Sequence, residues 1–264
     1  MIIGRKKMIV GRRVLRLDEA TSTNDVAKSL GKEGEEEGFV VLAKRQTSGR
    51  GRMGKGWSSP EGGLYMSVLL RPKMRGPELL RMTVFSCVPV AEAIEEVCGI
   101  KVQLKWPNDL MVDGAKVGGI LVEGVSKGTR LDLVVLGIGL NVNSAPDQIG
   151  EEGATSLRTA LDRDVDLDIL FEALLRNLEK FYMSLQQDAL DEEGYVVRSC
   201  TLGREIEATV GKERFRGKAL YLAPDGALVL RSDEGLVLRL SWVNETSIRT
   251  TNSEELAVET LRKD

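Results

Sequence analysis

Residues 131–142 read LDLVVLGIGLNV, a long apolar run that predicts a buried strand in a central position of a sheet. Gly137 and Gly139 lie within this run and indicate that another group comes close to the backbone there. Around it, segments typical of strands outnumber segments typical of crossover helices. We therefore expect an α+β fold, in which a mixed, largely antiparallel sheet carries helices packed on one face.

Strand-like segments lie on the N-terminal side of this run. They are residues 14–17, 39–43, 64–70, 102–105, 110–112 and 117–122. The turn signal Asp113-Gly114 separates the last two and predicts a hairpin. Apolar residues spaced by three and four positions predict a long amphipathic helix over residues 77–99, kinked at Pro89. A short helix is expected after residues 21–25, because several of their side chains can cap it.

The pattern changes toward the C-terminus. Residues 167–185 and 192–197 have helical spacing, whereas the segments after Cys200 are short and broken by turn signals. These later segments, predicted to be strands, are residues 206–210, 215–221, 227–230 and 236–240. They predict a small SH3-like β-barrel. We expect a catalytic domain at residues 1–200, the barrel domain at 201–250 and a polar tail at 251–264.

Composition excludes several classes of chemistry. The chain has no histidine, which rules out Ser-His-Asp and Cys-His catalysis and any imidazole metal site. Its three cysteines are odd in number and lack C-x-x-C spacing, so neither a disulfide framework nor a zinc site is predicted. A net charge of −3 argues against broad nucleic-acid affinity. No apolar run approaches the roughly 20 residues of a membrane helix, and we expect a cytoplasmic protein with no membrane partner.

Residues 46–57 read QTSGRGRMGKGW and form a glycine-rich basic loop between two predicted strands. Five positive and no negative side chains lie between residues 44 and 55. Glycine lets backbone N–H groups approach a ligand closely, and the arginines add forked donors, so the loop is suited to binding an anion. The alternative is a flexible solvated basic loop. Trp57 argues against it, because an exposed indole is unfavourable unless it covers something.

Four further stretches can carry chemistry, although each also has a plain structural explanation. They read STN at residues 22–24, KWPND at 105–109, KVGGI at 116–120 and GIGLN at 137–141. The first can be a helix cap, Lys116 can be a solvated hairpin residue, and the two glycines of the last can be a bulge.

Together with the basic loop, in this order and spacing, these stretches resemble the biotin protein ligases over residues 15–247. Departures from the family pattern are Met53, where basic residues are frequent, and Pro89 within the long helix. About twenty residues precede Ser22, too few for a three-helix DNA-binding unit, so the resemblance is to the monofunctional type.

The resemblance implies a two-step reaction. Biotin and ATP give biotinyl-5′-AMP and pyrophosphate, and a lysine of a biotin carboxyl carrier protein then attacks the mixed anhydride. The implied catalytic residues are Lys116, Arg50, Arg52 and Asp109. Cationic side chains are needed because a carboxylate must approach a triphosphate. Asp109 either orients Lys116 or receives the proton of the acceptor lysine.

The resemblance also implies the binding residues. For biotin they are Ser22, Thr23, Asn24, Gln46, Gly49, Arg50, Gly51, Arg52, Lys116 and Gly119. For the nucleotide they are Arg50, Arg52, Trp57, Lys116 and Asn141. ATP and Mg²⁺ are expected as cofactors, with the magnesium ion bridging the leaving phosphates and no metal-ligating residue assigned. A homodimer and the absence of a nucleic-acid partner are also expected.

Three alternatives stay open. A lipoate ligase shares the chemistry, but Gln46 and the Gly/Arg loop favour a substrate with a ureido ring. A biotin-responsive transcription regulator that also ligates is less favoured because of the short segment before Ser22. A noncatalytic small-molecule binding module is disfavoured by the joint presence of Lys116, Arg50 and Arg52.

Overall fold

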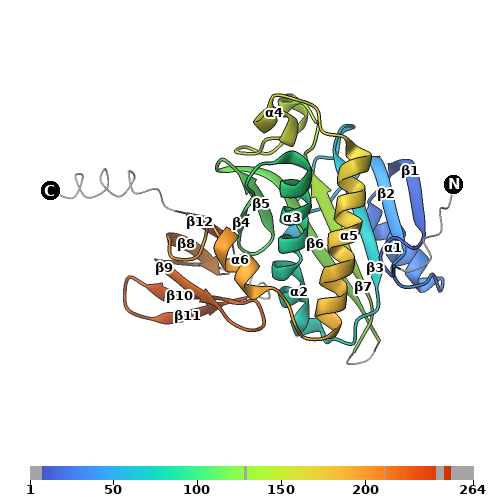
Figure 1. Ribbon diagram of the computed structural model, residues 1–264. Helices are drawn as coiled ribbons and strands as arrows, with labels where there is room; N and C mark the ends of the chain where they lie inside the picture. Colours follow the sequence, from blue (N-terminus) through green and yellow to red (C-terminus); the bar gives the residue numbers. More distant parts are fainter. Residues whose placement is uncertain (1–7, 128–129, 211, 242–246, 251–264) are drawn as a thin grey trace.

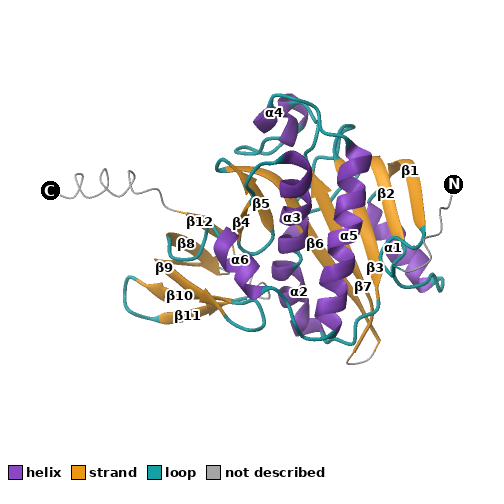
Figure 2. Cartoon of the chain, viewed as in Figure 1, coloured by secondary structure: helices purple, strands orange, loops and turns teal. Residues whose placement is uncertain are grey.

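The computed structural model describes residues 8–127, 130–210, 212–241 and 247–250. The predicted polar tail at 251–264 lies outside these residues. The predicted α+β class is confirmed: the chain forms a large mixed sheet, a smaller antiparallel sheet and several helices (Figure 1). Figure 2 shows that the long helices and the strands of the large sheet form separate layers.

The large sheet has seven strands in the order β1-β2-β3-β7-β6-β5-β4. The strands are β1 (Val14–Ala20), β2 (Val40–Gln46), β3 (Leu64–Leu70), β4 (Gln103–Lys105), β5 (Asp109–Val112), β6 (Ala115–Lys127) and β7 (Arg130–Leu140). Only the β1–β2 pair is parallel, so the sheet is mixed and largely antiparallel, as predicted. The strand predicted from residues 131–142 is β7, and it is the central strand.

Helices cover both faces of this sheet. They are α1 (Thr23–Lys32), α2 (Leu79–Phe85), α3 (Cys87–Cys98), α4 (Leu157–Leu161), α5 (Leu167–Gln186) and α6 (Glu192–Arg198). Figure 1 shows α2, α3 and α5 across one face. The other face carries α1, which packs on β2, β3 and β7 through a second apolar cluster that includes Ala27, Leu69 and Val135. The expectation that helices lie on one face only is therefore wrong for α1.

The long helix predicted at residues 77–99 is two helices. A short 3-10 turn at Gly76–Glu78 leads into α2, and the chain breaks at Ser86 before α3 begins. Pro89 is the third residue of α3, where its missing N–H cannot donate to the carbonyl of Phe85. The predicted distortion is thus present, but it falls three residues before the proline.

The chain after α6 forms an open sheet. Its strands are β8 (Glu205–Val210), β9 (Glu213–Leu222), β10 (Leu228–Ser232), β11 (Val237–Leu240) and β12 (Ser247–Thr250), in the order β11-β10-β9-β8-β12. The described strands leave β11 and β12 unpaired with each other, so among them the expected barrel is not closed. The last strand, β12, was not predicted. The domain boundary at residue 200 stays a prediction; it falls between α6 and β8.

The small sheet is attached directly to the large one. The buried indole of Trp106 donates from Nε1 to the carbonyl of Gly226, 2.9 Å away, and its backbone N–H donates to Thr201 Oγ1 at 3.0 Å. The segment after β4 is therefore fixed against the turn between β9 and β10. Among the described residues, no helix combines the length and apolar composition that a membrane crossing requires.

Candidate functional site

A cavity of about 450 Å³ opens on the α1 side of the large sheet. Its walls come from the start of α1, the end of β2, the Gly/Arg loop, residues 105–109, strands β6 and β7, and residues 149–151. The face opposite the α2, α3 and α5 layer thus holds the candidate site. Twelve of the thirteen predicted site residues line the cavity: Ser22, Thr23, Asn24, Gln46, Arg50, Gly51, Arg52, Trp57, Asp109, Lys116, Gly119 and Asn141.

Gly49 is the predicted residue that does not line the cavity. A Cβ at this position would lie 2.5 Å from the carbonyl oxygen of Trp57 and 2.6 Å from Ser59 Oγ. The backbone N–H of Trp57 also donates to the Gly49 carbonyl at 2.9 Å. Gly49 therefore closes the base of the loop, and its direct contact with a substrate stays a prediction.

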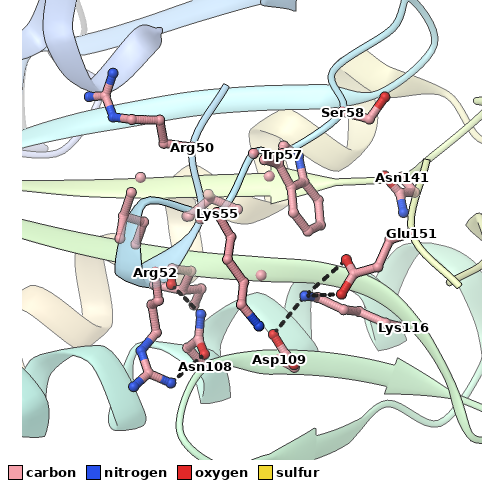
Figure 3. A pocket seen from close by; sticks show the side chains of 18 of the residues that line it. Arg50, Arg52, Lys55, Trp57, Ser58, Asn108, Asp109, Lys116, Asn141 and Glu151 are labelled. Atoms are coloured by element: carbon pink, nitrogen blue, oxygen red, sulfur yellow. Dashed lines mark hydrogen bonds and ion pairs between the residues drawn. The ribbon is translucent and has the colours of Figure 1, made fainter. Parts of the chain in front are cut away.

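Lys116 lies at the beginning of β6 between two carboxylates. Its Nζ is 3.1 Å from Asp109 Oδ1 and 3.2 Å from Glu151 Oε2, and it lies 5.0 Å from the ring centroid of Trp57 (Figure 3). The β5–β6 hairpin brings Asp109 to this position. A backbone bond from the Lys116 N–H to the Gly153 carbonyl at 3.0 Å brings the segment that carries Glu151. The side chain is mostly buried but opens into the cavity.

Trp57 lies over a pair of glycines in adjacent strands. Gly119 and Gly139 face each other across the β6–β7 ladder. A Cβ at Gly139 would lie 2.8 Å from Nε1 of Trp57, and one at Gly119 would lie 3.7 Å from Cζ3. The pairing of β7 with β3 and β6 is regular at Gly137 and Gly139, so the bulge explanation for these two glycines is wrong. Nε1 is buried against this surface and has no hydrogen-bond partner among the described residues.

The side chains of the two loop arginines contact different partners. Arg50 forms a bidentate pair with Asp25 of α1, with N–O distances of 2.5 and 2.6 Å. Nη1 of Arg52 lies 3.5 Å from Asn108 Oδ1. Figure 3 shows the two side chains directed away from each other. Burial lowers the pKa of Arg52 from its usual value, against the opposing effect of the Asp109 charge. The arginines and Lys116 therefore do not converge on one point in this state.

Neutral polar groups line the end of the cavity at α1. Ser22 is the N-cap residue of that helix, but its side chain makes no capping bond, which corrects the cap prediction. Instead Gln46 Oε1 accepts from the backbone N–H of Thr23 at 2.8 Å, and Gln46 Nε2 donates to Ser59 Oγ at 2.8 Å. Gln46 is thus oriented by the helix N-terminus and by Ser59, in the segment between the loop and β3.

Asn24 and Asn141 are both buried polar residues at the cavity wall. A Cβ at Gly137 would lie 2.2 Å from Asn24 Oδ1, so this glycine makes room for Asn24. Asn141 follows β7 and donates from Nδ2 to the carbonyl of Thr155 at 3.1 Å. Glycines of the central strand therefore serve two side chains, Asn24 and Trp57.

Comparisons with known proteins identify the family. The sequence model described as the biotin/lipoate A/B protein ligase family matches residues 16–141. The bifunctional ligase/repressor BirA of Bacillus subtilis (strain 168) is 34% identical over 239 residues, which cover 88% of this chain and 74% of that protein. The chain belongs to the biotin protein ligases.

Further similarity to biotin protein ligases extends through both sheets. The biotin–[acetyl-CoA-carboxylase] ligase of Paracoccus denitrificans is 32% identical over 212 residues, covering 74% of this chain and 85% of that enzyme. The solved structure of the Aquifex aeolicus biotin protein ligase in complex with biotin and ATP is 32% identical, with a TM-score of 0.76, and covers 90% of this chain and 99% of that one. The resemblance stated from the motifs is confirmed.

Some cavity residues were not predicted. Glu151 lies 35 positions from Lys116 in a polar segment without a motif, and only the backbone bridge reveals their proximity. Asn108 belongs to a stretch that was singled out, yet its role as a partner of Arg52 was not assigned. Asp25, which pairs with Arg50 outside the cavity lining, was not predicted either, because a carboxylate on the first turn of a helix is explained by the helix dipole alone.

Proposed function

We propose that this chain uses ATP to convert biotin into biotinyl-5′-AMP and then transfers the biotinyl group to a lysine of a biotin carboxyl carrier protein. The observation that carries the proposal is the position of Lys116. Its ammonium group lies between an indole-covered surface and two carboxylates, in a cavity whose other end is neutral and polar.

In the first step, a carboxylate oxygen of biotin attacks the α-phosphorus of ATP. A new P–O bond forms, the bond to the β-phosphate oxygen breaks, and pyrophosphate leaves. Two anions must meet, so a fixed ammonium group between them lowers the barrier. Lys116 is assigned this role. Its present partners, Asp109 and Glu151, are at ion-pair distance, and a ligand carboxylate or phosphate can replace one of them.

Biotin binds with its ureido ring at the neutral polar end, against Ser22, Thr23, Asn24 and Gln46, and with its carboxylate toward Lys116. The backbone of Gly51 and the surface at Gly119 allow a close approach. The nucleotide lies beside Trp57, whose ring covers the adenine. Asn141 borders the same part of the cavity.

Arg50 and Arg52 supply further positive charge to the phosphates. Among the described residues, no group of three or more acidic or cysteine side chains is placed to hold a metal ion. Magnesium commonly binds through one or two carboxylates plus substrate phosphates. Asp109 and Glu151 fit that role, and the ion would neutralise the leaving pyrophosphate.

In the second step, the ε-amine of the carrier lysine attacks the acyl carbon of the anhydride. The new C–N bond forms as AMP leaves, and the amine loses a proton. Asp109 lies beside Lys116 and can take that proton or keep Lys116 oriented. A homodimer, cytoplasmic location and the absence of nucleic-acid and membrane partners stay predictions.

The proposal is tested by incubating the chain with ATP, biotin and a carboxyl carrier domain and measuring the intact mass of the domain. We expect the mass of one added biotinyl group and the release of pyrophosphate. Pyrophosphate exchange that occurs with lipoate and not with biotin would assign the lipoate ligase alternative. Biotin binding without pyrophosphate release would assign a noncatalytic module.

A further inference from the structure

A chain of polar contacts runs from the surface of α1 to the neutral end of the cavity. It begins at an ion pair between Lys28 Nζ and Glu123 Oε1, 2.5 Å apart. The other oxygen, Glu123 Oε2, accepts from Asn24 Nδ2 at 2.6 Å. Asn24 Oδ1 is 2.6 Å from Ser67 Oγ, which is 2.8 Å from Thr23 Oγ1. Lys28, Glu123 and Ser67 lie outside the cavity lining, whereas Asn24 and Thr23 belong to it.

The direction of the hydrogen bonds in this chain follows from the donors available. A carboxylate only accepts, so the amide nitrogen of Asn24 must face Glu123 and its oxygen must face Ser67. The carbonyl of Leu121, 3.4 Å from Asn24 Nδ2, requires the same orientation. Because an amide oxygen cannot donate, Ser67 Oγ must donate its single hydroxyl proton to Asn24 Oδ1.

The cavity wall is consequently short of one proton. Thr23 Oγ1 lies 2.8 Å from Ser67 Oγ and 3.1 Å from Gln46 Oε1, which already accepts the Thr23 N–H. Ser67 has no second proton, and Thr23 has one proton for two oxygen neighbours. One of these oxygen–oxygen contacts therefore lacks a donor. Thr23 Oγ1 and Gln46 Oε1, which belong to residues of the cavity lining, therefore have lone pairs to which a ligand N–H can donate.

We propose that Glu123 is a positioning residue that sets this hydrogen-bond direction and so selects an acid whose ring carries N–H donors. This inference rests on the proposed function, in which the ureido ring of biotin is the donor. A buried acceptor left without a donor costs free energy, so an acid that has no N–H in its ring, such as lipoate, is penalised at this wall. The selection is made from behind the cavity wall, without contact between Glu123 and the substrate.

The variant Glu123→Gln reverses the direction of these hydrogen bonds with little change in the shape of the side chain. Lys28 can only donate, so the amide oxygen of the new side chain stays with Lys28 and its NH₂ group faces Asn24. Asn24 then turns its oxygen to that group and its nitrogen to Ser67. The Ser67 proton passes to Thr23 and the Thr23 proton passes to Gln46, so each side-chain contact has a donor without a ligand, and only the 3.4 Å contact of Asn24 with the Leu121 carbonyl is lost.

The experiment compares ligand affinities of the full chain by calorimetry. For Glu123→Gln we expect the dissociation constant of biotin to rise about tenfold, that of lipoate to stay the same or fall, and that of ATP to stay within about twofold. The matched control is Glu35→Gln. This side chain forms an ion pair of the same 2.5 Å length with Arg13 and lies outside the cavity lining, so biotin affinity should be unchanged.

A second variant separates an effect on hydrogen-bond direction from an effect on the stability of the fold. Ser67→Ala breaks the chain of contacts at a fully buried position and should also weaken biotin binding. If Glu123 acts through Ser67, then Glu123→Gln added to Ser67→Ala should have little further effect on biotin affinity. If Glu123→Gln does not fold, Ser67→Ala alone decides, and an unchanged biotin affinity overturns the proposal.

The outcomes also separate this inference from the proposed function. Wild-type chain that binds biotin and forms the adenylate, together with Glu123→Gln that binds biotin equally well, would overturn the role of Glu123 and leave the ligase function standing. Wild-type chain that forms no adenylate and binds no biotin would overturn both. Additive losses in the double variant would assign Glu123 to general stability and not to hydrogen-bond direction.

Discussion

The two ends of the cavity are built differently. At the neutral end, Thr23 and Asn24 of α1 are each only 4% exposed, and their side-chain partners belong to strands of the sheet. At the charged end, Lys116 is held by Asp109 and by Glu151, whose side chain is 51% exposed. Ion pairs of exposed groups are weak because water screens them, whereas buried hydrogen bonds keep their geometry. The neutral end is preorganised for recognition, and the charged end has counter-ions that a ligand can displace.

The largest effect expected at the charged end is that of Lys116→Ala. Removing the ammonium group should lower the rate of pyrophosphate release about 10³-fold, because the approach of two anions loses its fixed cation. Biotin affinity should stay within about twofold, since the ureido ring is held at the other end. Pyrophosphate exchange measures the first quantity and calorimetry the second.

The control for that variant is Lys44→Ala, which removes an exposed lysine paired with Asp18 at 2.7 Å and should leave both quantities unchanged. Equal losses of biotin binding and adenylate formation in Lys116→Ala would contradict the separation of the two ends.

Arg52→Gly tests whether the loop retains the intermediate. If Arg52 seals the cavity over biotinyl-5′-AMP, its loss should release the anhydride and raise the labelling of an unrelated protein by roughly one to two orders of magnitude. Labelling is measured by mass spectrometry of lysine-rich bystander protein. Arg45→Gly is the control, because Arg45 pairs with Glu19 of β1 outside the cavity lining. A variant that still modifies only the carrier domain would count against the seal.

Gly139→Ala should affect the nucleotide more than biotin. Its Cβ would meet Trp57 at 2.8 Å, so the indole has to shift, and the KM for ATP should rise about five- to tenfold. Gly119→Ala is a useful comparison on the facing strand. Its Cβ first meets an atom at 3.7 Å, so the unliganded position of Trp57 should be retained, which tryptophan fluorescence can measure. Equal fluorescence changes in both variants would contradict the closer contact of Trp57 with Gly139 than with Gly119.

Local patterns in the sequence predicted the elements well. The apolar run at residues 131–142 contains the central strand, and the Asp113-Gly114 signal predicted the β5–β6 turn, where both residues have positive φ, +48° and +79°. These features are determined by neighbours along the chain. The barrel was less predictable, because closure depends on the pairing of β11 with β12 and not on the strands themselves.

The parts of the site that depend on register across the sheet were not predictable. Glu123 of β6 reaches Asn24 only because α1 packs over β7, the neighbour of β6, and Glu151 reaches Lys116 only through a bridge between distant segments. Neither carboxylate belongs to a motif. The basic loop shows the opposite case, since its composition predicted an anion site but could not indicate that Arg50 and Arg52 diverge.

That divergence leads to the smallest expected effect, and it decides the role of Arg50. The hydrogen bonds from Arg50 hold the pKa of Asp25 below its usual value, so the contribution of the pair is present at neutral pH and is lost only as the pH falls through that lowered pKa. If Arg50 contributes charge to the phosphates, it has to leave Asp25 first, and the pair competes with ATP.

Asp25→Asn weakens the competitor, and the KM for ATP should then fall about two- to threefold, a range set by the partial exposure of both side chains. Asp18→Asn, which disrupts the exposed pair with Lys44, should leave the KM unchanged. A rise in KM for Asp25→Asn would instead make Arg50 a tether between α1 and the loop. In that case the charged end would depend on Lys116 and Arg52 alone, and the preorganised part of the cavity would extend into the loop itself.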